Sequence, residues 1–191
     1  MAKYYFEDET FKDENYSEKK LPKGEYDHCV FQNIVFNGAD LANITFQNCS
    51  FENCDLSLAK IKDAAFREVK FTHCKMIGLR FDEVKPSQLA LSFQHCILNF
   101  SYFEGLKMQK TIFENSKLEE VAFLNIDLTS AVFHHCDLVR ALFEHCNLQK
   151  VDFRTASHLS IDPEKNKMKQ AQFSAANVLG LLEKYQIVVE Y

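Results

Sequence analysis

Large apolar residues recur every five positions along almost the whole chain, and this spacing restricts the possible folds more than any other feature. The grid runs from Phe6 to Phe81, jumps by 12 residues, and continues from Phe93 to Phe153. A period of five matches neither the 3.6-residue turn of a helix nor the two-residue alternation of a strand, so the backbone must turn once in every unit. Of the 18 phenylalanines, only Phe100 lies off this grid when its degenerate end is followed to Phe173.

A second inward position accompanies each grid residue. Two residues earlier, from Cys29 to Val151, the chain carries only Cys, Ala, Ile, Val, Leu, Ser or Thr. Residues two apart point the same way in extended backbone, so each unit sends one large and one small side chain inward and then turns a corner. The short polar residues between the two inward positions are expected to hydrogen-bond nearby backbone, and they include Asp40, Asp55, Asp127, Asp137 and Asn147.

This pattern resembles the A(D/N)LXX unit of the pentapeptide-repeat family, most closely at Ala39-Asp40-Leu41 and at Cys136-Asp137-Leu138. The resemblance implies an all-β solenoid, specifically a right-handed quadrilateral parallel β-helix in which four units form one coil. Successive coils would then stack about 4.8 Å apart. One column of such coils is entirely aromatic and is predicted to stack; it contains Phe31, Phe51, Phe71, Phe93, Phe113, Phe133 and Phe153.

The grid divides the chain into three parts. Residues 1–27 keep the large positions but place Glu9, Glu14 and Lys19 at the small inward one, where unpaired charges cannot be buried. An irregular N-terminal cap is therefore expected there, followed by the β-helix over 28–155. The extra residues at about 84–90, which include Pro86, are either a tolerated protruding corner or a partner-binding loop.

Residues 156–191 are interpreted as a degenerate last coil followed by a capping helix. Ser174 offers an N-cap for an α-helix of about 175–185, and residues 187–189 predict a short closing strand. The helix is apolar on more than one side, so we expect a homodimer, as the resemblance also implies; the alternative is a monomer whose helix lies flat on the coil end. The expected interface residues are Val178, Leu179, Leu181, Leu182 and Tyr185.

Seven cysteines and seven histidines, with five adjacent His-Cys pairs, raise the question of a metal site. Each cysteine occupies the small inward position and its histidine neighbour points outward, so the two cannot converge on one ion. Stacked parallel cysteines also have the wrong mutual orientation for a disulfide. We therefore expect free buried thiols and no metal. The chain carries no nucleophile elbow or glycine-rich phosphate loop, so neither enzymatic activity nor a cofactor is expected.

The formal net charge of -5 argues against direct nucleic-acid binding. No apolar run approaches the roughly 18 residues that span a bilayer, and the first residues lack the apolar stretch of a signal peptide. The expectation is a cytoplasmic protein without membrane association.

Two functions remain open from the sequence. The first is a rigid protein-interaction scaffold with an unknown partner. The second, implied by the resemblance to Qnr-type quinolone-resistance members of the family, is a DNA mimic that binds DNA gyrase or topoisomerase IV and protects it from fluoroquinolones. Residues 28–155 contain 15 acidic and 13 basic residues, which is a weak charge for a DNA mimic unless carboxylates gather on one face. The residues expected to face a partner are Glu104, Glu114, Glu119, Glu120, Glu144 and Pro86.

Overall fold

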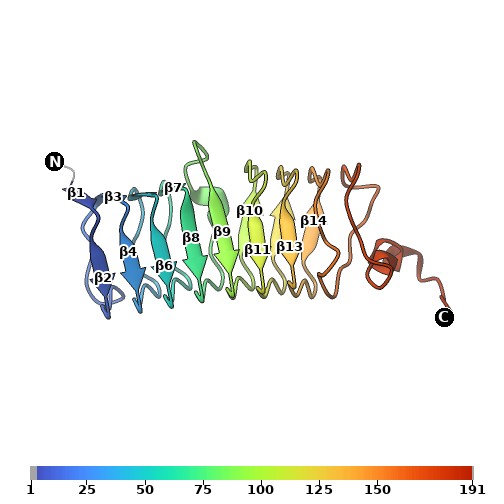
Figure 1. Cartoon of the computed structure of the whole chain (residues 1–191), viewed down its shortest axis with the longest axis horizontal. Coiled ribbons are helices and arrows are strands. Elements are labelled where there is room, and N and C mark those ends of the chain that lie inside the picture. The colour runs from blue at the N-terminus through green and yellow to red at the C-terminus, as the bar shows by residue number, and fades with distance from the viewer. Residues whose placement is uncertain (1–3, 191) are drawn as a thin grey trace.

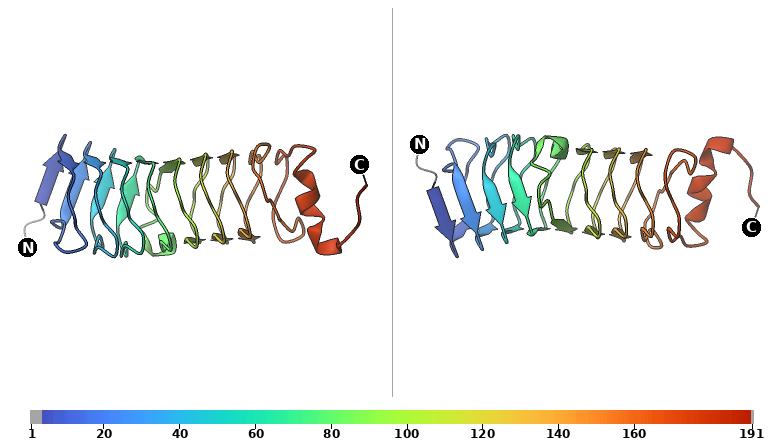
Figure 2. Two further views of the ribbon diagram at one scale, coloured as in Figure 1. Left: turned by 90° about the horizontal axis from the view of Figure 1, so that it is seen from below. Right: turned by 90° about the horizontal axis from the view of Figure 1, so that it is seen from above.

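The computed structural model describes residues 4–190 and shows a rod of stacked coils, with the two ends of the chain at opposite ends of the rod (Figures 1 and 2). The coils pair in parallel along four ladders, which we number 1 to 4 in chain order. One coil and its successor are paired at Thr10↔Val30 and Val30↔Ser50 on ladder 2, Val35↔Asp55 on ladder 3, Asp40↔Lys60 on ladder 4 and Thr45↔Ala65 on ladder 1. The coils therefore form a parallel β-solenoid.

Short strands occupy three of the ladders. Ladder 1 contains β1 (Tyr4–Glu7), β3 (Gly24–Asp27), β5 (Thr45–Gln47) and β7 (Ala65–Arg67). Ladder 2 contains β2 (Thr10–Lys12), β4 (Val30–Gln32), β6 (Ser50–Glu52), β8 (Val69–Thr72), β9 (Leu91–Gln94), β11 (Ile112–Glu114) and β13 (Val132–His134). Ladder 4 contains β10 (Tyr102–Glu104), β12 (Ala122–Leu124) and β14 (Leu142–Glu144). Ladder 3 is made of single-residue bridges from Asn15 to Ser157.

The predicted all-phenylalanine column is confirmed and forms the centre of ladder 2. Its rings are fully buried and stack face to face, with centroids 4.6 Å apart between Phe31 and Phe51 and 4.7 Å apart between Phe113 and Phe133. Close-packed rings of one size fill the interior of the coils because the column repeats the same volume at every turn.

The two extra residues between Phe81 and Phe93 shift the pairing register. Phe71 pairs with Phe93, 22 residues further on, where other coils pair across 20. The chain forms the 3-10 helix η1 (Phe81–Glu83) and then a loop that projects from the rod before β9 (Figure 1, green). The ladder absorbs the insertion without losing the ring stack, since Phe71 and Phe93 remain stacked at 5.6 Å.

The corners between units have a common backbone conformation. In most units, the second residue after the large inward residue has a positive φ, as at Asn33 (54°), Asn53 (53°) and His73 (53°). Asn, Asp and His tolerate this left-handed conformation better than other side chains, which explains how the corners form with few glycines. The predicted polar turns are also present, since the amides of Ala42 and Ser57 donate to the Oδ1 atoms of Asp40 and Asp55 at 3.0 and 2.9 Å.

The irregular cap expected over residues 1–27 is not what the structure shows. Within the described part of that segment, β1, β2 and β3 continue ladders 1 and 2 in register, and only the turn before β3 is irregular; residues 1–3 lie outside the described residues. The rings of Phe6 and Tyr26 stack with centroids 4.6 Å apart, so the large inward residues of this segment continue the packed interior of the coils. The charges at the small positions remain solvated because this coil is the open end, where Glu14 pairs with Lys19.

The predicted C-terminal α-helix is wrong. Residues 178–185 form two 3-10 helices, η2 (Val178–Leu181) and η3 (Glu183–Tyr185), which cover the end of the last coil (Figure 2). Ser174 does accept a hydrogen bond from the Asn177 amide at 3.3 Å, as an N-cap would. The Asn177 side chain, however, donates to the carbonyl oxygens of Phe153 and Ala156, which holds the segment against the coil in short i→i+3 turns.

The predicted closing strand at 187–189 is also wrong. These residues have no strand assignment and 54%, 88% and 42% of their surface is exposed, because η2 and η3 separate them from the last ladder edge (Figure 1). Tyr191 lies outside the described residues. Over 4–190, none of the helices has the length and apolar character required to cross a bilayer.

Candidate functional site

Two bulky apolar residues occupy corner positions on the outside of ladder 3. Leu58 and Phe100 have φ values of 57° and 62°, and 64% and 53% of their surface is exposed. Every other non-glycine residue with positive φ among residues 4–190 is polar or charged. A bulky side chain gains nothing for folding in this conformation, and left-handed backbone costs about 1–2 kcal/mol per residue relative to right-handed.

The two side chains lie on the same corner of ladder 3, two coils apart. Gly78 occupies the corner between them, and its amide donates to the carbonyl of Asn99 at 3.0 Å. A Cβ atom on Gly78 would lie 2.9 Å from Cδ2 of Leu58, so the leucine side chain extends over the glycine toward the coil of Phe100. We call Leu58, Gly78, Phe100 and the partly exposed Ile77 and Ile97 beside them the apolar ridge.

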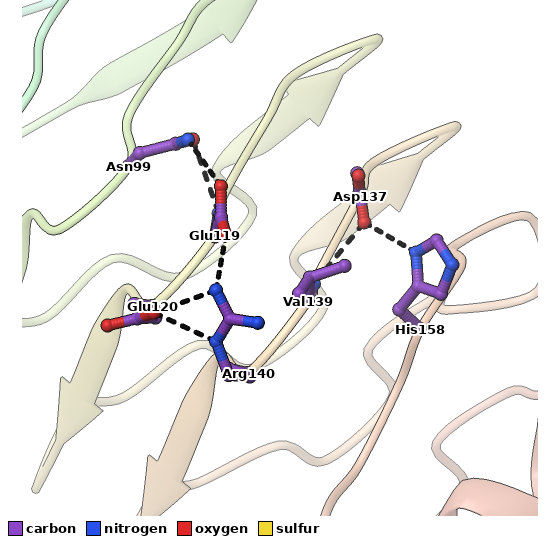
Figure 3. A network of polar contacts seen from close by, with 7 residues as sticks. All are labelled: Asn99, Glu119, Glu120, Asp137, Val139, Arg140 and His158. Carbon is purple, nitrogen blue, oxygen red and sulfur yellow. Dashed lines mark hydrogen bonds and ion pairs between the residues drawn. The ribbon is translucent and has the colours of Figure 1, made fainter.

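A charged network continues the same corner beyond the ridge (Figure 3). Arg140 donates through Nε to Oε1 of Glu120 at 2.8 Å and pairs through Nη2 with Glu119. Asn99 exchanges two hydrogen bonds with Glu119, one to its side chain at 3.1 Å and one from its amide at 3.3 Å. The corner thus presents apolar side chains followed by a fixed arrangement of charges. This order suits a protein partner with an apolar centre and a polar rim.

The five carboxylates predicted to face a partner lie on three different ladders. Glu104 and Glu144 end β10 and β14 on ladder 4, Glu114 ends β11 on ladder 2, and Glu119 and Glu120 follow ladder 3. Three of them are paired with cations. Arg140 holds Glu119 and Glu120, and Lys165 lies 2.6 Å from Glu144 and lowers the pKa of that carboxyl by its hydrogen bond. These five residues therefore do not form one acidic stripe.

The other predicted positions are also separated from one another. Pro86 lies exposed in the inserted loop. Of the expected dimer residues, Val178, Leu182 and Tyr185 expose 39%, 38% and 52% of their surface, whereas Leu181 packs against the core. The expected dimer residues lie in or beside η2 and η3, at the C-terminal end of the rod (Figure 2).

The cysteines are free and buried, as the sequence predicts. Their thiols contact backbone carbonyls, for example Cys49 Sγ to the carbonyl oxygen of Tyr26 at 3.3 Å. Burial raises the pKa of Cys49 and of Cys136 to about 12, so these thiols are protonated at neutral pH. The neighbouring histidines point outward, and His73 stacks on His95 with ring centroids 4.6 Å apart. No group of three or more metal-binding side chains converges within residues 4–190.

Sequence reasoning missed the apolar ridge, although one signal pointed to it. Phe100 is the phenylalanine that lies off the five-residue grid, and an aromatic residue that the core does not require is a candidate for a surface role. Leu58 gave no such signal, because leucine is common at many positions of the repeat.

Comparison with known proteins agrees with the architecture. The chain matches the family model described as "Pentapeptide repeat region" over residues 19–91 and 87–153, and it therefore belongs to the pentapeptide-repeat family. No curated protein sequence matches it.

Among solved structures, the fold is similar to two trypsin-treated variants of QnrB1, a plasmid-mediated fluoroquinolone resistance protein. The first has a TM-score of 0.63 at 15% identity, with 98% of each chain covered. The second has the same TM-score and identity, with 95% of this chain and 99% of that chain covered. HetL, a pentapeptide repeat protein involved in heterocyst differentiation regulation from the cyanobacterium Nostoc sp. strain PCC 7120, matches with a TM-score of 0.43 at 15% identity over 89% of this chain and 84% of HetL. At these identities the likeness concerns the fold alone.

Proposed function

We propose that this chain is a non-enzymatic, rigid protein-interaction scaffold whose protein partner binds the apolar ridge. The observation that carries the proposal is the pair Leu58 and Phe100, exposed and held in left-handed backbone at corners where the rest of the described solenoid places polar residues or glycine. The interior is filled by stacked phenylalanine rings, which supports a role for the outer surface instead of an internal substrate pocket.

The partner is expected to place apolar side chains on Leu58 and Phe100 and hydrogen-bonding groups near Glu119 and Arg140. Apolar side chains at the centre of an interface contribute most of its binding energy, while rim charges set the orientation. The stacked coils hold the ridge in place, so binding requires little ordering of the scaffold.

A photo-crosslinking amino acid at position 100 tests this proposal in the native host. We expect one discrete adduct with a second protein, identified by mass spectrometry, that disappears when Leu58→Asn is added. The matched control places the same amino acid at Asn125, an exposed corner on ladder 4 with a φ of 49°. Adducts of equal yield from both positions, or an adduct with a second copy of this chain, would contradict the proposal.

DNA mimicry is the second candidate, favoured by the likeness to the QnrB1 fold over nearly the whole length of both chains. The scattered and partly paired carboxylates weigh against it. Purified protein added to a gyrase supercoiling assay, with and without ciprofloxacin, tests this candidate. Protection of gyrase that survives Leu58→Asn and Phe100→Asn would favour mimicry over the scaffold. If the protein at molar excess neither inhibits that gyrase nor rescues it from ciprofloxacin, that gyrase is excluded as a target.

We also infer that the coils form the right-handed quadrilateral helix of the family, which the four ladders per coil support. Self-association through Val178, Leu182 and Tyr185 is a further part of the proposal, supported by their exposure at the rod end. Light scattering should give twice the 22.2 kDa chain mass, and a particle of 22.2 kDa would contradict it. The free thiols fit a cytoplasmic location, where cysteines stay reduced.

A further inference from the structure

The inserted loop leaves a groove on the outside of ladder 1. Before the groove, the amide of Ala90 donates to the carbonyl of Phe66 at 3.2 Å, and the ladder resumes only with the Lys107↔Asp127 bridge. The groove is open to solvent and has a volume of about 320 Å³ between Leu89 and Ala90 on one side and the coil of Lys107 on the other. Three ammonium groups and one carboxylate line it, from Lys70, Lys107, Lys110 and Glu68.

Lysines recur along ladder 1 between the groove and the end of the rod, in every coil except that of Asp127. The bridges Lys107↔Asp127, Asp127↔Asn147 and Asn147↔Lys167 place these outward residues in one row. The next residues of the same coils add Lys110, Lys150 and Lys169, where the amide of Lys150 donates to the carbonyl of Lys169 at 3.0 Å. We call the following set the lysine surface: Lys70, Lys107, Lys110, Lys150, Lys167 and Lys169.

The charge of the lysine surface is not neutralised by the protein. All six lysines are exposed, and among residues 4–190 none of them lies within 4.0 Å of a carboxylate oxygen. Lysines elsewhere do find partners, since Lys23 lies 2.8 Å from Asp40 and Lys184 lies 2.7 Å from Asp162.

The one carboxylate in the row is already engaged. Asp127 accepts hydrogen bonds from the amide and the hydroxyl of Thr129, at 3.0 and 2.6 Å, and from Nε2 of Gln109 at 2.7 Å. These uncharged donors hold the carboxylate in place and it keeps its negative charge, so one negative charge stands in the row against the six ammonium groups of the lysine surface. The row carries a positive charge in a protein whose net charge is negative.

We propose that the lysine surface and its groove bind an extended, acidic segment of a partner protein. Ammonium groups act as point charges that can meet carboxylates without a fixed geometry, and their spacing by whole coils suits a linear chain of negative charges. The outward residues of ladder 1 from Lys107 to Gln170 include neither an aromatic side chain nor an arginine, so the surface lacks the stacking groups with which proteins hold single-stranded nucleic acid.

This inference deepens the proposed scaffold function, because it adds a second binding surface and specifies that the bound segment of the partner is acidic and extended. It rests on that function, but the lysine surface lies on ladder 1 and, through Lys70, on the adjoining edge of ladder 2, whereas the apolar ridge lies on ladder 3, so the two can be disrupted separately. The variant Leu58→Asn with Phe100→Asn should leave binding at the lysine surface unchanged.

Fluorescence anisotropy with a labelled oligoglutamate peptide tests the proposal. The triple variant Lys107→Glu, Lys110→Glu and Lys150→Glu should weaken binding at least about tenfold at low salt, and the wild-type affinity should fall as salt screens the charges. The matched control reverses three other exposed lysines, Lys60, Lys62 and Lys117, and should weaken binding by no more than about threefold through net charge alone.

Three results would overturn the proposal. They are an equal loss of affinity in both triple variants, no binding of the peptide by the wild-type protein at low salt, and tighter binding of a single-stranded oligonucleotide of matched charge. All substituted lysines are exposed, so circular dichroism should show the same folded spectrum for both variants and the wild type.

Discussion

The coils before and after the inserted loop share one aromatic column but place the second one on different ladders. Phenylalanine fills ladder 2 in both halves. In the first half, Phe46 and Phe66 on ladder 1 supply the second stack, with centroids 5.4 Å apart. In the second half, ladder 1 carries Leu128 and Leu148, and the second stack moves to ladder 4, where Phe123 lies 4.8 Å from Phe143.

This difference shows what a coil requires. Each half sets two rings of one coil nearly at right angles, as at Phe46 and Phe51 (74°) and at Phe113 and Phe123 (82°). Strands form on the ladder that carries the second aromatic stack, since ladder 1 has strands only before the loop and ladder 4 only after it. A stack on ladder 1 would be interrupted where the loop leaves the coil, whereas Phe81 in η1 begins a new stack by lying 4.4 Å from Phe103.

The two halves also differ in surface charge over ladder 1. The first coils carry acidic residues there, including Glu7, Asp8 and Asp27, whereas the coils after the loop carry the lysine surface. The loop therefore marks a change both in the core and on the outside, although the backbone repeat is the same on either side.

The largest expected effect comes from removing a ring of the second stack. Phe46→Ala in the first half and Phe123→Ala in the second should each lower the free energy of unfolding by about 3–5 kcal/mol, because each leaves a cavity in a buried stack. Urea denaturation of the two variants measures this. A small loss at one site and a large loss at the other would show that the two stacks are not equivalent.

A smaller effect should follow from returning a ring to ladder 1 in the second half. Leu128→Phe should cost about 1–3 kcal/mol by overpacking a fully buried position. Adding Phe123→Leu should recover part of that loss, since the coil again contains two rings. A double-mutant cycle measures the coupling, and strictly additive losses would contradict the idea that aromatic volume per coil is what matters.

Removing the left-handed backbone strain at Phe100 should raise the free energy of unfolding. Phe100→Asn places a residue that tolerates left-handed backbone at the corner, and we expect a gain of about 1 kcal/mol with a higher melting temperature. The reverse change, Asn125→Phe, is the control on ladder 4 and should lose a similar amount. Equal stability of the wild type, Phe100→Asn and Asn125→Phe would contradict the idea that Phe100 lowers the stability of the fold.

The smallest effect concerns a charge clamp at the end of the second half. The Arg154 side chain hydrogen-bonds Asp152 and, with a smaller contribution from His134, lowers the pKa of that carboxyl to about 2. A lowered folded-state pKa stabilises the protein above the usual value near 3.8 and stops doing so as the pH falls through about 2.

Arg154→Met should therefore reduce stability only slightly at pH 6, because solvent screens the exposed guanidinium, and the difference from wild type should shrink toward pH 2. Unfolding measured against pH tests this. Lys70, an exposed lysine of ladder 2 in the first half at the position that Asp152 occupies in the second, provides the control, since Lys70→Met should show no such pH dependence. A difference that grew on acidification would contradict the clamp.

Much of the core could be predicted from the sequence, and little of the outer surface could. The column from Phe31 to Phe153, the buried cysteines and the turn at Asp40 all follow from local spacing, because side-chain direction along a chain is a local property. The C-terminal α-helix failed because contacts of Asn177 with Phe153 and Ala156, more than 20 residues away, set the local geometry. Local propensity is weak against such tertiary contacts.

The sequence alone determined that the chain winds into a repeating β-solenoid, since a five-residue period with one large and one small inward residue leaves little choice of backbone. Only the tertiary structure decided which outward residues share a surface. That surface combines residues from different coils, and the two extra residues at one loop change which residues become neighbours across that loop. The pairing of Glu119 and Glu120 with Arg140, the apolar ridge and the lysine surface all depend on that stacking.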